Sequence, residues 1–184
     1  VESNFKKTTR IAVLGSFTLN GLADTIKVKC AELNIFTHIF SGEYNQYNKD
    51  ILDSNSSLYS FSPEICFLIL DTRNILENLF HSPYSVSDDD RKKFVEEKSI
   101  ELFNLINFFI KNSHSKLIVT NFVPPTYSPY GIFETKTIYG FQEMINDLNQ
   151  NLLNEFKNNS SVFIFDFNGF VTNIGQNNIF DYRQ

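Results

Sequence analysis

The chain has 184 residues, enough for one domain with a substantial hydrophobic core. Its hydrophobic share of 42% and charged share of 20% are ordinary for a soluble globular protein, and its net charge of -5 argues against nucleic-acid binding. No apolar run approaches the ~20 residues that a membrane-spanning helix needs, and no signal peptide precedes Arg10, so we expect a cytoplasmic protein without a membrane partner.

Five short apolar runs rich in Ile, Val and Phe predict β-strands. The runs are continuous rather than alternating, which is typical of strands covered by helices on both faces. In chain order they are RIAVL (10–14), FTHIF (36–40), EICFLIL (64–70), KLIVTNF (116–122) and SVFIFDF (161–167).

Amphipathic patterns between these runs predict helices. Residues 22–33 repeat apolar side chains along one stripe, and residues 87–112 begin with Ser87 as an N-cap, followed by three aspartates in the first turn. Further predicted segments are a helix within 137–159, a short helix near 48–52 and a proline-rich loop at 123–131.

Alternating strands and helices predict an α/β fold, specifically a three-layer α/β/α sandwich. We expect a mostly parallel five-stranded sheet with a flavodoxin-like strand order. Residues 1–9 form an N-terminal extension in this interpretation, and residues 10–184 form a single domain.

Small and polar residues follow each predicted strand. Because ligands of such sheets bind at the carboxyl ends of the strands, these residues are the candidates for a site. They are Gly15, Ser16 and Thr18 after the first strand, Gly42 after the second, and Asp71, Arg73 and Asn74 after the third.

This combination resembles the SGNH (GDSL-type) hydrolases. That family carries a Gly-Asp-Ser turn after its first strand, an oxyanion-hole glycine after its second, a Gly-x-Asn-Asp motif after its third, and a late Asp-x-x-His. Here Gly15-Ser16-Phe17 stands for the first motif, Gly42 for the second, DTRN (71–74) for the third and Asp181 for the fourth.

The sequence departs from the SGNH pattern at the reacting groups. Aligning Gly15 with the family's glycine puts Phe17 at the nucleophile position, and Arg73 falls at the oxyanion asparagine. Asp181 is followed by Tyr, Arg and Gln, so the histidine base is missing. Because a serine hydroxyl is a poor nucleophile without a base, whether the chain is an enzyme stays open.

A second resemblance fits these departures. LGSFTLNGL, LDSNSSLYSFSPEICFLI, IVTNFVPP and FDFNGFVTNIGQNNIFDYR resemble the N-terminal region of FkbH-type proteins. There an SGNH-like domain precedes a phosphatase domain of the haloacid dehalogenase (HAD) type. The resemblance implies that the chain is part of a longer protein that loads a glyceryl or acyl unit onto an acyl carrier protein in polyketide-type biosynthesis.

The same resemblance implies the partners and the chemistry of this domain. The expected partner is a phosphopantetheine-bearing acyl carrier protein or the adjoining HAD-type domain. Hydrolase motifs are degenerate, and the role is binding or docking with no cofactor in this domain. The alternatives are an active serine esterase or acyltransferase and a purely structural docking domain.

Each candidate residue also has a structural interpretation. Ser16 is the nucleophile of the esterase alternative or a turn residue at the first helix, and Thr18 is a second nucleophile candidate or that helix's N-cap. His81 is the only histidine predicted near the rim of strand ends, so it is the candidate base. In the esterase alternative the Ser16 and Gly42 N–H groups, with Asn74, form the oxyanion hole.

Two further motifs have competing interpretations. Arg73 can hold a carboxylate or phosphate, or pair with a carboxylate of a neighbouring helix, while Asp71 organises the turn. FDFNGFV resembles the Asp-x-Asp loop of HAD-type phosphatases, but Asn168 replaces the general acid, so we interpret Asp166 as a turn former. Cys30 and Cys66 lack metal-type spacing, so we expect buried free thiols and no metal site.

Overall fold

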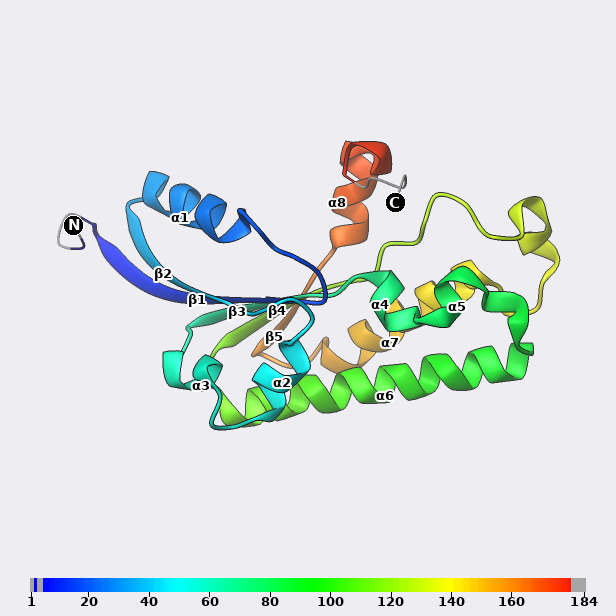
Figure 1. Ribbon diagram of the computed structural model, residues 1–184, viewed down its shortest axis with the longest axis horizontal. Helices are drawn as coiled ribbons and strands as arrows, with labels where there is room; N and C mark the ends of the chain where they lie inside the picture. Colours follow the sequence, from blue (N-terminus) through cyan, green and yellow to red (C-terminus); the bar gives the residue numbers. More distant parts are fainter. Residues whose placement is uncertain (1, 3–4, 180–184) are drawn as a thin grey trace. The chain divides into compact units, whose positions relative to one another are not determined.

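A computed structural model describes residues 2 and 5–179 of the chain (Figure 1). The chain divides into two compact units. The first contains Val1–Ile69, Asn104–Val119 and Asn159–Phe163, and the second contains Leu70–Phe103, Thr120–Asn158 and Ile164–Gln184. No helix of the described part is both long and apolar enough to cross a membrane.

Five strands form one sheet in the order β2-β1-β3-β4-β5, and the pairs β1–β2, β1–β3 and β3–β4 are parallel. This is the predicted flavodoxin-like order. All five predicted strands are present, although the first begins earlier and the last two end sooner than expected. Their bounds are β1 Lys7–Gly15, β2 Ile35–Ser41, β3 Ile65–Ile69, β4 Lys116–Thr120 and β5 Val162–Phe165.

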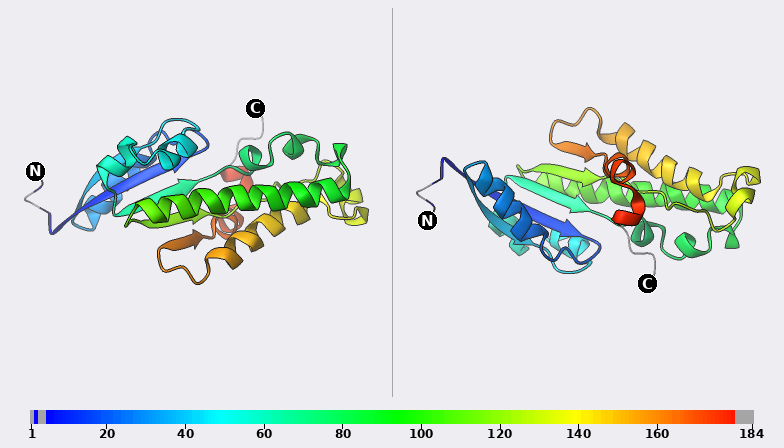
Figure 2. Two further views of the ribbon diagram at one scale, coloured as in Figure 1. Left: turned by 90° about the horizontal axis from the view of Figure 1, so that it is seen from below. Right: turned by 90° about the horizontal axis from the view of Figure 1, so that it is seen from above.

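The first unit has helices on both faces of its strands. α1 (Leu22–Glu32) covers one face, while α2 (Tyr47–Leu52), α3 (Ser57–Phe61) and the end of α6 (Asp88–Asn112) lie on the other (Figures 1 and 2). Its core is formed by fully buried strand residues, with Ile51, Leu58 and Phe109 from the helices beneath them.

α1 differs from its prediction in two ways. None of its residues is buried, so the predicted apolar stripe packs only loosely, and Cys30 is half-buried rather than buried. Gly21 occupies the N-cap position with a φ of 81° and no side chain caps the helix, so the prediction of Thr18 as N-cap is wrong. Glycine reaches this left-handed conformation without the steric cost that a β-carbon would impose.

The second unit is mostly helical. Its elements are α4 (Thr72–Leu76), α5 (Asn78–His81), the 3₁₀ helices η2 (Pro83–Ser85), η3 (Gly131–Lys136) and η4 (Gln176–Asn178), the first part of α6, α7 (Phe141–Phe156) and α8 (Phe167–Ile174). α6 begins as predicted, because Ser87 Oγ accepts the Asp90 N–H at 3.1 Å. α7 packs on α6 through an edge-to-face contact of Phe103 with Phe156.

A buried arginine in α6 holds the loop that leads into α7. Arg91 is 5% exposed. Its Nε donates to the Tyr139 carbonyl at 2.9 Å, its Nη1 to Val86 at 2.8 Å and its Nη2 to Ile138 at 2.9 Å. The guanidinium also lies 5.1 Å from the centre of the Tyr84 ring. One side chain therefore ties α6 to chain segments on both of its sides.

We expect Arg91→Ala to lower the free energy of unfolding by about 2–4 kcal/mol, because three charge-assisted hydrogen bonds are lost at a buried site. Urea unfolding followed by far-UV circular dichroism measures this. The matched control is Lys93→Ala on the exposed face of the same helix, which should change stability by no more than ~0.5 kcal/mol. Equal stability of both variants would show that the three carbonyl contacts contribute nothing.

Candidate functional site

The Gly-Ser turn at the end of β1 is packed tightly. The Ser16 N–H donates to the Ile69 carbonyl at 3.1 Å, and the whole residue is buried at 0% exposure. A β-carbon on Gly15 would lie 2.9 Å from that same carbonyl oxygen and 2.8 Å from Leu19 Cδ1. Glycine is therefore required here for the close approach of β1 to β3.

Gly42, at the end of β2, is held in the same manner. Its N–H donates to the Val13 carbonyl at 2.9 Å, and a β-carbon would meet Leu14 Cδ2 at 2.8 Å and Asp50 Oδ2 at 3.2 Å. Burial, and then the charge of Glu43, raises the pKa of the Asp50 carboxyl. A titratable group thus lies beside the predicted oxyanion glycine, which the sequence interpretation did not identify.

These contacts leave no preformed oxyanion hole at the two predicted N–H groups. Both Ser16 and Gly42 use their N–H in bonds that continue the sheet. The Asp50 carboxyl beside Gly42 opposes a developing negative charge whenever it is ionised. Ser16 is also fully buried, so the turn is a packed strand end and does not present the serine to solvent.

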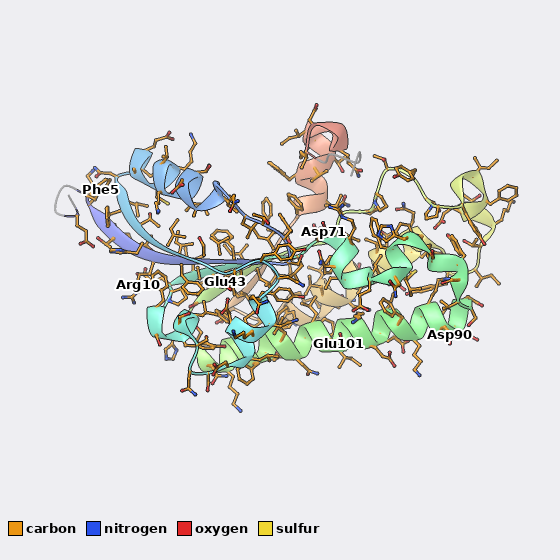
Figure 3. All side chains as sticks on the ribbon, in the orientation of Figure 1. Phe5, Arg10, Glu43, Asp71, Asp90 and Glu101 are labelled. Atoms are coloured by element: carbon orange, nitrogen blue, oxygen red, sulfur yellow. The ribbon has the colours of Figure 1, made fainter. Side chains whose placement is uncertain are left out.

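The predicted Asp71–Asn74 cluster lies in the second unit, at the start of α4 (Figure 3). Asp71 caps this helix, since its Oδ1 accepts the Arg73 N–H at 2.9 Å. The Arg73 guanidinium donates to Asp71 Oδ2 from Nε at 3.1 Å and from Nη2 at 2.9 Å. The carboxylate that pairs with Arg73 thus belongs to the N-cap residue of its own helix, not to a neighbouring helix as the structural interpretation of Arg73 expected, and the turn role of Asp71 is confirmed. Asn74 is half-buried one residue further on.

The histidines occupy three separate places. His81 is exposed at the end of α5 and packs edge-to-face on Phe80. His38 is exposed on β2, 3.0 Å from Glu2. His114 lies before β4, at the amino end of that strand. Among the residues that the structure describes, no group of three or more His, Cys, Asp or Glu side chains could hold a metal ion.

The candidates therefore form two clusters, each described within its own unit. Gly15, Ser16, Thr18 and Gly42 belong to the first unit. The Asp71–Asn74 cluster and His81 belong to the second. Asp181, the predicted counterpart of the catalytic aspartate, lies outside the described residues.

The turn after β5 has the structural role that the sequence suggested. Asp166 caps α8, accepting the Gly169 N–H at 2.9 Å and the Asn121 amide at 2.8 Å on Oδ1. These hydrogen bonds lower the pKa of the Asp166 carboxyl. The interpretation of Asp166 as a turn former is confirmed.

The proline-rich loop is organised by a carboxylate, Glu134, that belongs to none of the sequence motifs described above. Glu134 accepts hydrogen bonds from the Tyr84 and Ser128 hydroxyls and from the Gln142 N–H at 2.9 Å. Partial burial opposes its ionisation, but these hydrogen bonds outweigh it and lower the pKa of Glu134. Tyr84 and Tyr130 stack beside it with ring centres 3.7 Å apart. The network fixes a loop whose apolar side chains Ile132, Phe133 and Ile138 are exposed.

We expect Glu134→Gln to lower the melting temperature at pH 7 by roughly 2–4 °C, because the ionised acceptor of three hydrogen bonds is lost. Since folding lowers the pKa of Glu134, its stabilising contribution is complete above the unfolded value near 4.3 and is lost as the pH falls through the folded value. Melting curves of both proteins should therefore converge on acidification. Glu155→Gln, at an exposed position of α7, is the control and should show no such convergence. A difference that stays constant between pH 7 and pH 3 would contradict the charge-based explanation.

Comparison with known proteins gives one family and one fold. A family model described as the FkbH N-terminal domain matches residues 10–184. No curated protein matches the chain. The N-terminal part of a Bacteroides fragilis protein, which contains a phosphatase domain, has 24% identity and a TM-score of 0.79, covering 95% of this chain and 44% of that one. The chain thus spans less than half of that relative.

Two lipase structures share the fold at lower identity. A lipase from a goat rumen metagenome has 11% identity and a TM-score of 0.57 over 86% of this chain and 80% of its own. A structure from Parabacteroides merdae, provisionally assigned as a GDSL-like lipase, has 13% identity and a TM-score of 0.52 over 93% of this chain and 83% of its own. The mostly parallel α/β fold is therefore that of the SGNH and GDSL-type hydrolases.

Proposed function

Because the chain belongs to the family of FkbH N-terminal domains, we propose that it is a binding domain in the loading of a glyceryl or acyl unit onto an acyl carrier protein. In this proposal the chemistry belongs to an adjoining HAD-type domain, and the role of this domain is to dock the phosphopantetheine-bearing carrier protein. It needs no cofactor of its own. The pathway class we propose is polyketide-type biosynthesis.

The observation that carries the proposal is the packing at the end of β1. Ser16 is fully buried, and the N–H groups of Ser16 and Gly42 are already hydrogen-bonded to carbonyls of the sheet. Acyl transfer from a serine needs an accessible hydroxyl, a base and donors aimed at the developing oxyanion. The lipase-like fold is retained, whereas the described turn has a buried serine and two N–H groups that already donate to carbonyls.

Arg73 is the side chain that we propose contacts the carrier's phosphate. Its side chain is 52% exposed, against 17% for its partner Asp71. The Asp71 carboxylate holds the planar guanidinium at the start of α4 through two donors. A guanidinium presents its N–H donors in a planar fork whose geometry matches phosphate oxygens, which is why we assign the phosphate contact to Arg73.

We expect a phosphopantetheine-bearing carrier protein to bind the chain at micromolar concentration and Arg73→Gln to weaken that binding about tenfold, the effect of one charged hydrogen bond. Isothermal titration calorimetry measures both affinities. Lys93→Gln, an exposed cation on α6, is the control for a general charge effect and should bind as the wild type does. Absence of association at high micromolar concentration would contradict the docking role.

The esterase alternative makes the opposite prediction for Ser16. We expect no hydrolysis of short p-nitrophenyl esters above background, and equal background for the wild type, Ser16→Ala and Thr18→Ala, because the serine is buried. Circular dichroism confirms that each variant is folded. Turnover that disappears in Ser16→Ala but persists in Thr18→Ala would establish the esterase and overturn our proposal.

A further inference from the structure

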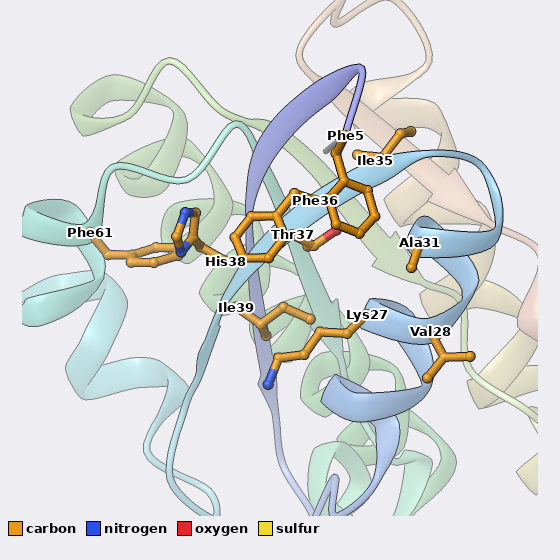
Figure 4. A pocket seen from close by; sticks show the side chains of 10 residues that line it. All are labelled: Phe5, Lys27, Val28, Ala31, Ile35, Phe36, Thr37, His38, Ile39 and Phe61. Atoms are coloured by element: carbon orange, nitrogen blue, oxygen red, sulfur yellow. The ribbon is translucent and has the colours of Figure 1, made fainter. Parts of the chain in front are cut away.

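β2 is an edge strand with an open groove along its outer side. It ends the sheet order, and no described segment pairs with its outer edge. The groove has a volume of about 650 Å³. Figure 4 shows its walls, with Val28 and Ala31 of α1 on one side of β2 and Phe61 of α3 on the other. All of these residues belong to the first unit.

The strand lacks the usual protections of an exposed edge. Its ladder with β1 runs without a bulge from Ile35 to Ser41, and the segment IFTHIFS contains no proline, lysine or acidic residue. Natural edge strands are normally blocked by such residues or by bulges, because alternate backbone N–H and C=O groups on the free side can pair with another strand. The described β2 strand therefore carries none of these features that block strand addition.

A buried hydroxyl in the groove has no partner. Thr37 lines the groove and is 7% exposed, and its Oγ1 makes no hydrogen bond with any described residue. Alternation along β2 places Ile35, Thr37 and Ile39 on one face, and Phe36 and His38 on the other. Because burying a hydroxyl without a hydrogen bond is unfavourable, an occupant that supplies a polar partner to Thr37 gains affinity.

The charges around the groove indicate the charge of the segment that it binds. Lys27 pairs with Asp24 and Lys29 with Glu32, so the charges within these two pairs largely cancel, and His38 Nε2 lies 3.0 Å from Glu2 Oε1. Lys6 and Lys7 are exposed and make no salt bridge with described residues. Lys7 is the β1 ladder partner of Ile35, so Lys6 and Lys7 lie level with the start of β2, one strand inward of its free edge.

We propose that β2 binds an extended peptide segment of a partner protein by strand addition. The segment alternates apolar with small polar residues and carries carboxylates at the end that lies beside Lys6 and Lys7. Backbone hydrogen bonds to β2 supply affinity, the walls from α1 and Phe61 hold alternate side chains, and a polar side chain of the segment reaches Thr37. This inference is independent of the carrier-protein role, which concerns the strand ends.

The test uses a fluorescein-labelled peptide of alternating valine and threonine with a glutamate pair at one end. We expect micromolar binding by fluorescence anisotropy. Two further peptides carry backbone N-methyl groups on alternate residues. In one peptide these groups lie on one edge of the extended peptide, and in the other peptide they lie on the opposite edge. Strand addition uses one edge only, so one of them should lose roughly tenfold or more in affinity while the other binds like the parent. Equal binding of both would overturn the proposal.

Variants locate the binding on β2. We expect Ile39→Lys to weaken binding roughly tenfold, because it puts a charge into the groove, and Leu33→Lys, exposed but outside the groove lining, to leave it unchanged. A peptide with lysines in place of glutamates should bind more weakly than the parent. Unchanged affinity of the Ile39→Lys variant for the peptide would overturn the proposal. Light scattering that shows a dimer of the chain, with no peptide bound to it, would also overturn the proposal and would assign the groove to a second copy of the chain.

Discussion

The positions of the residues after β1 and β2 depend on two hydrogen bonds that continue the sheet past the strand ends. The amides of Ser16 and Gly42 donate to carbonyls of neighbouring strands, and the glycine before Ser16 has no room for a side chain. In a hydrolase of this fold the same strand end must leave its donors pointing at a substrate. Here both N–H groups donate to carbonyls of the sheet, so the described conformation uses them to extend the strand pairing.

In the second unit, two charged side chains anchor irregular segments without pairing with each other. Arg91 is neutralised by carbonyl dipoles and Glu134 by hydroxyl and amide donors. A buried charge is tolerated when its hydrogen-bonding capacity is filled, even where no opposite charge is adjacent. The result is a loop with fixed backbone geometry that keeps its apolar side chains in solvent.

The sequence predicted the five strands and their order well, because continuous Val, Ile and Phe runs leave few alternatives to buried parallel strands. It also predicted the cap made by Ser87 and the turn roles of Asp71 and Asp166, whose hydrogen-bond partners lie within three residues. It failed where partners are remote, as for Arg91, whose acceptor Tyr139 is 48 residues away. The loose packing of α1 and the occupied N–H groups of Ser16 and Gly42 depend on three-dimensional spacing, which periodicity and motif patterns do not encode.

The two thiols of the first unit lie in contrasting surroundings. Cys66 is fully buried on β3, and burial raises the pKa of its thiol far above the usual range, so alkylating reagents meet neither an accessible sulfur nor a thiolate. Cys30, on the loosely packed α1, is half-buried. The protein therefore contains its own pair of chemical reporters. The rate at which Cys30 is labelled reports local fluctuation of α1. The rate at which Cys66 is labelled reports the larger opening in which the central strands separate.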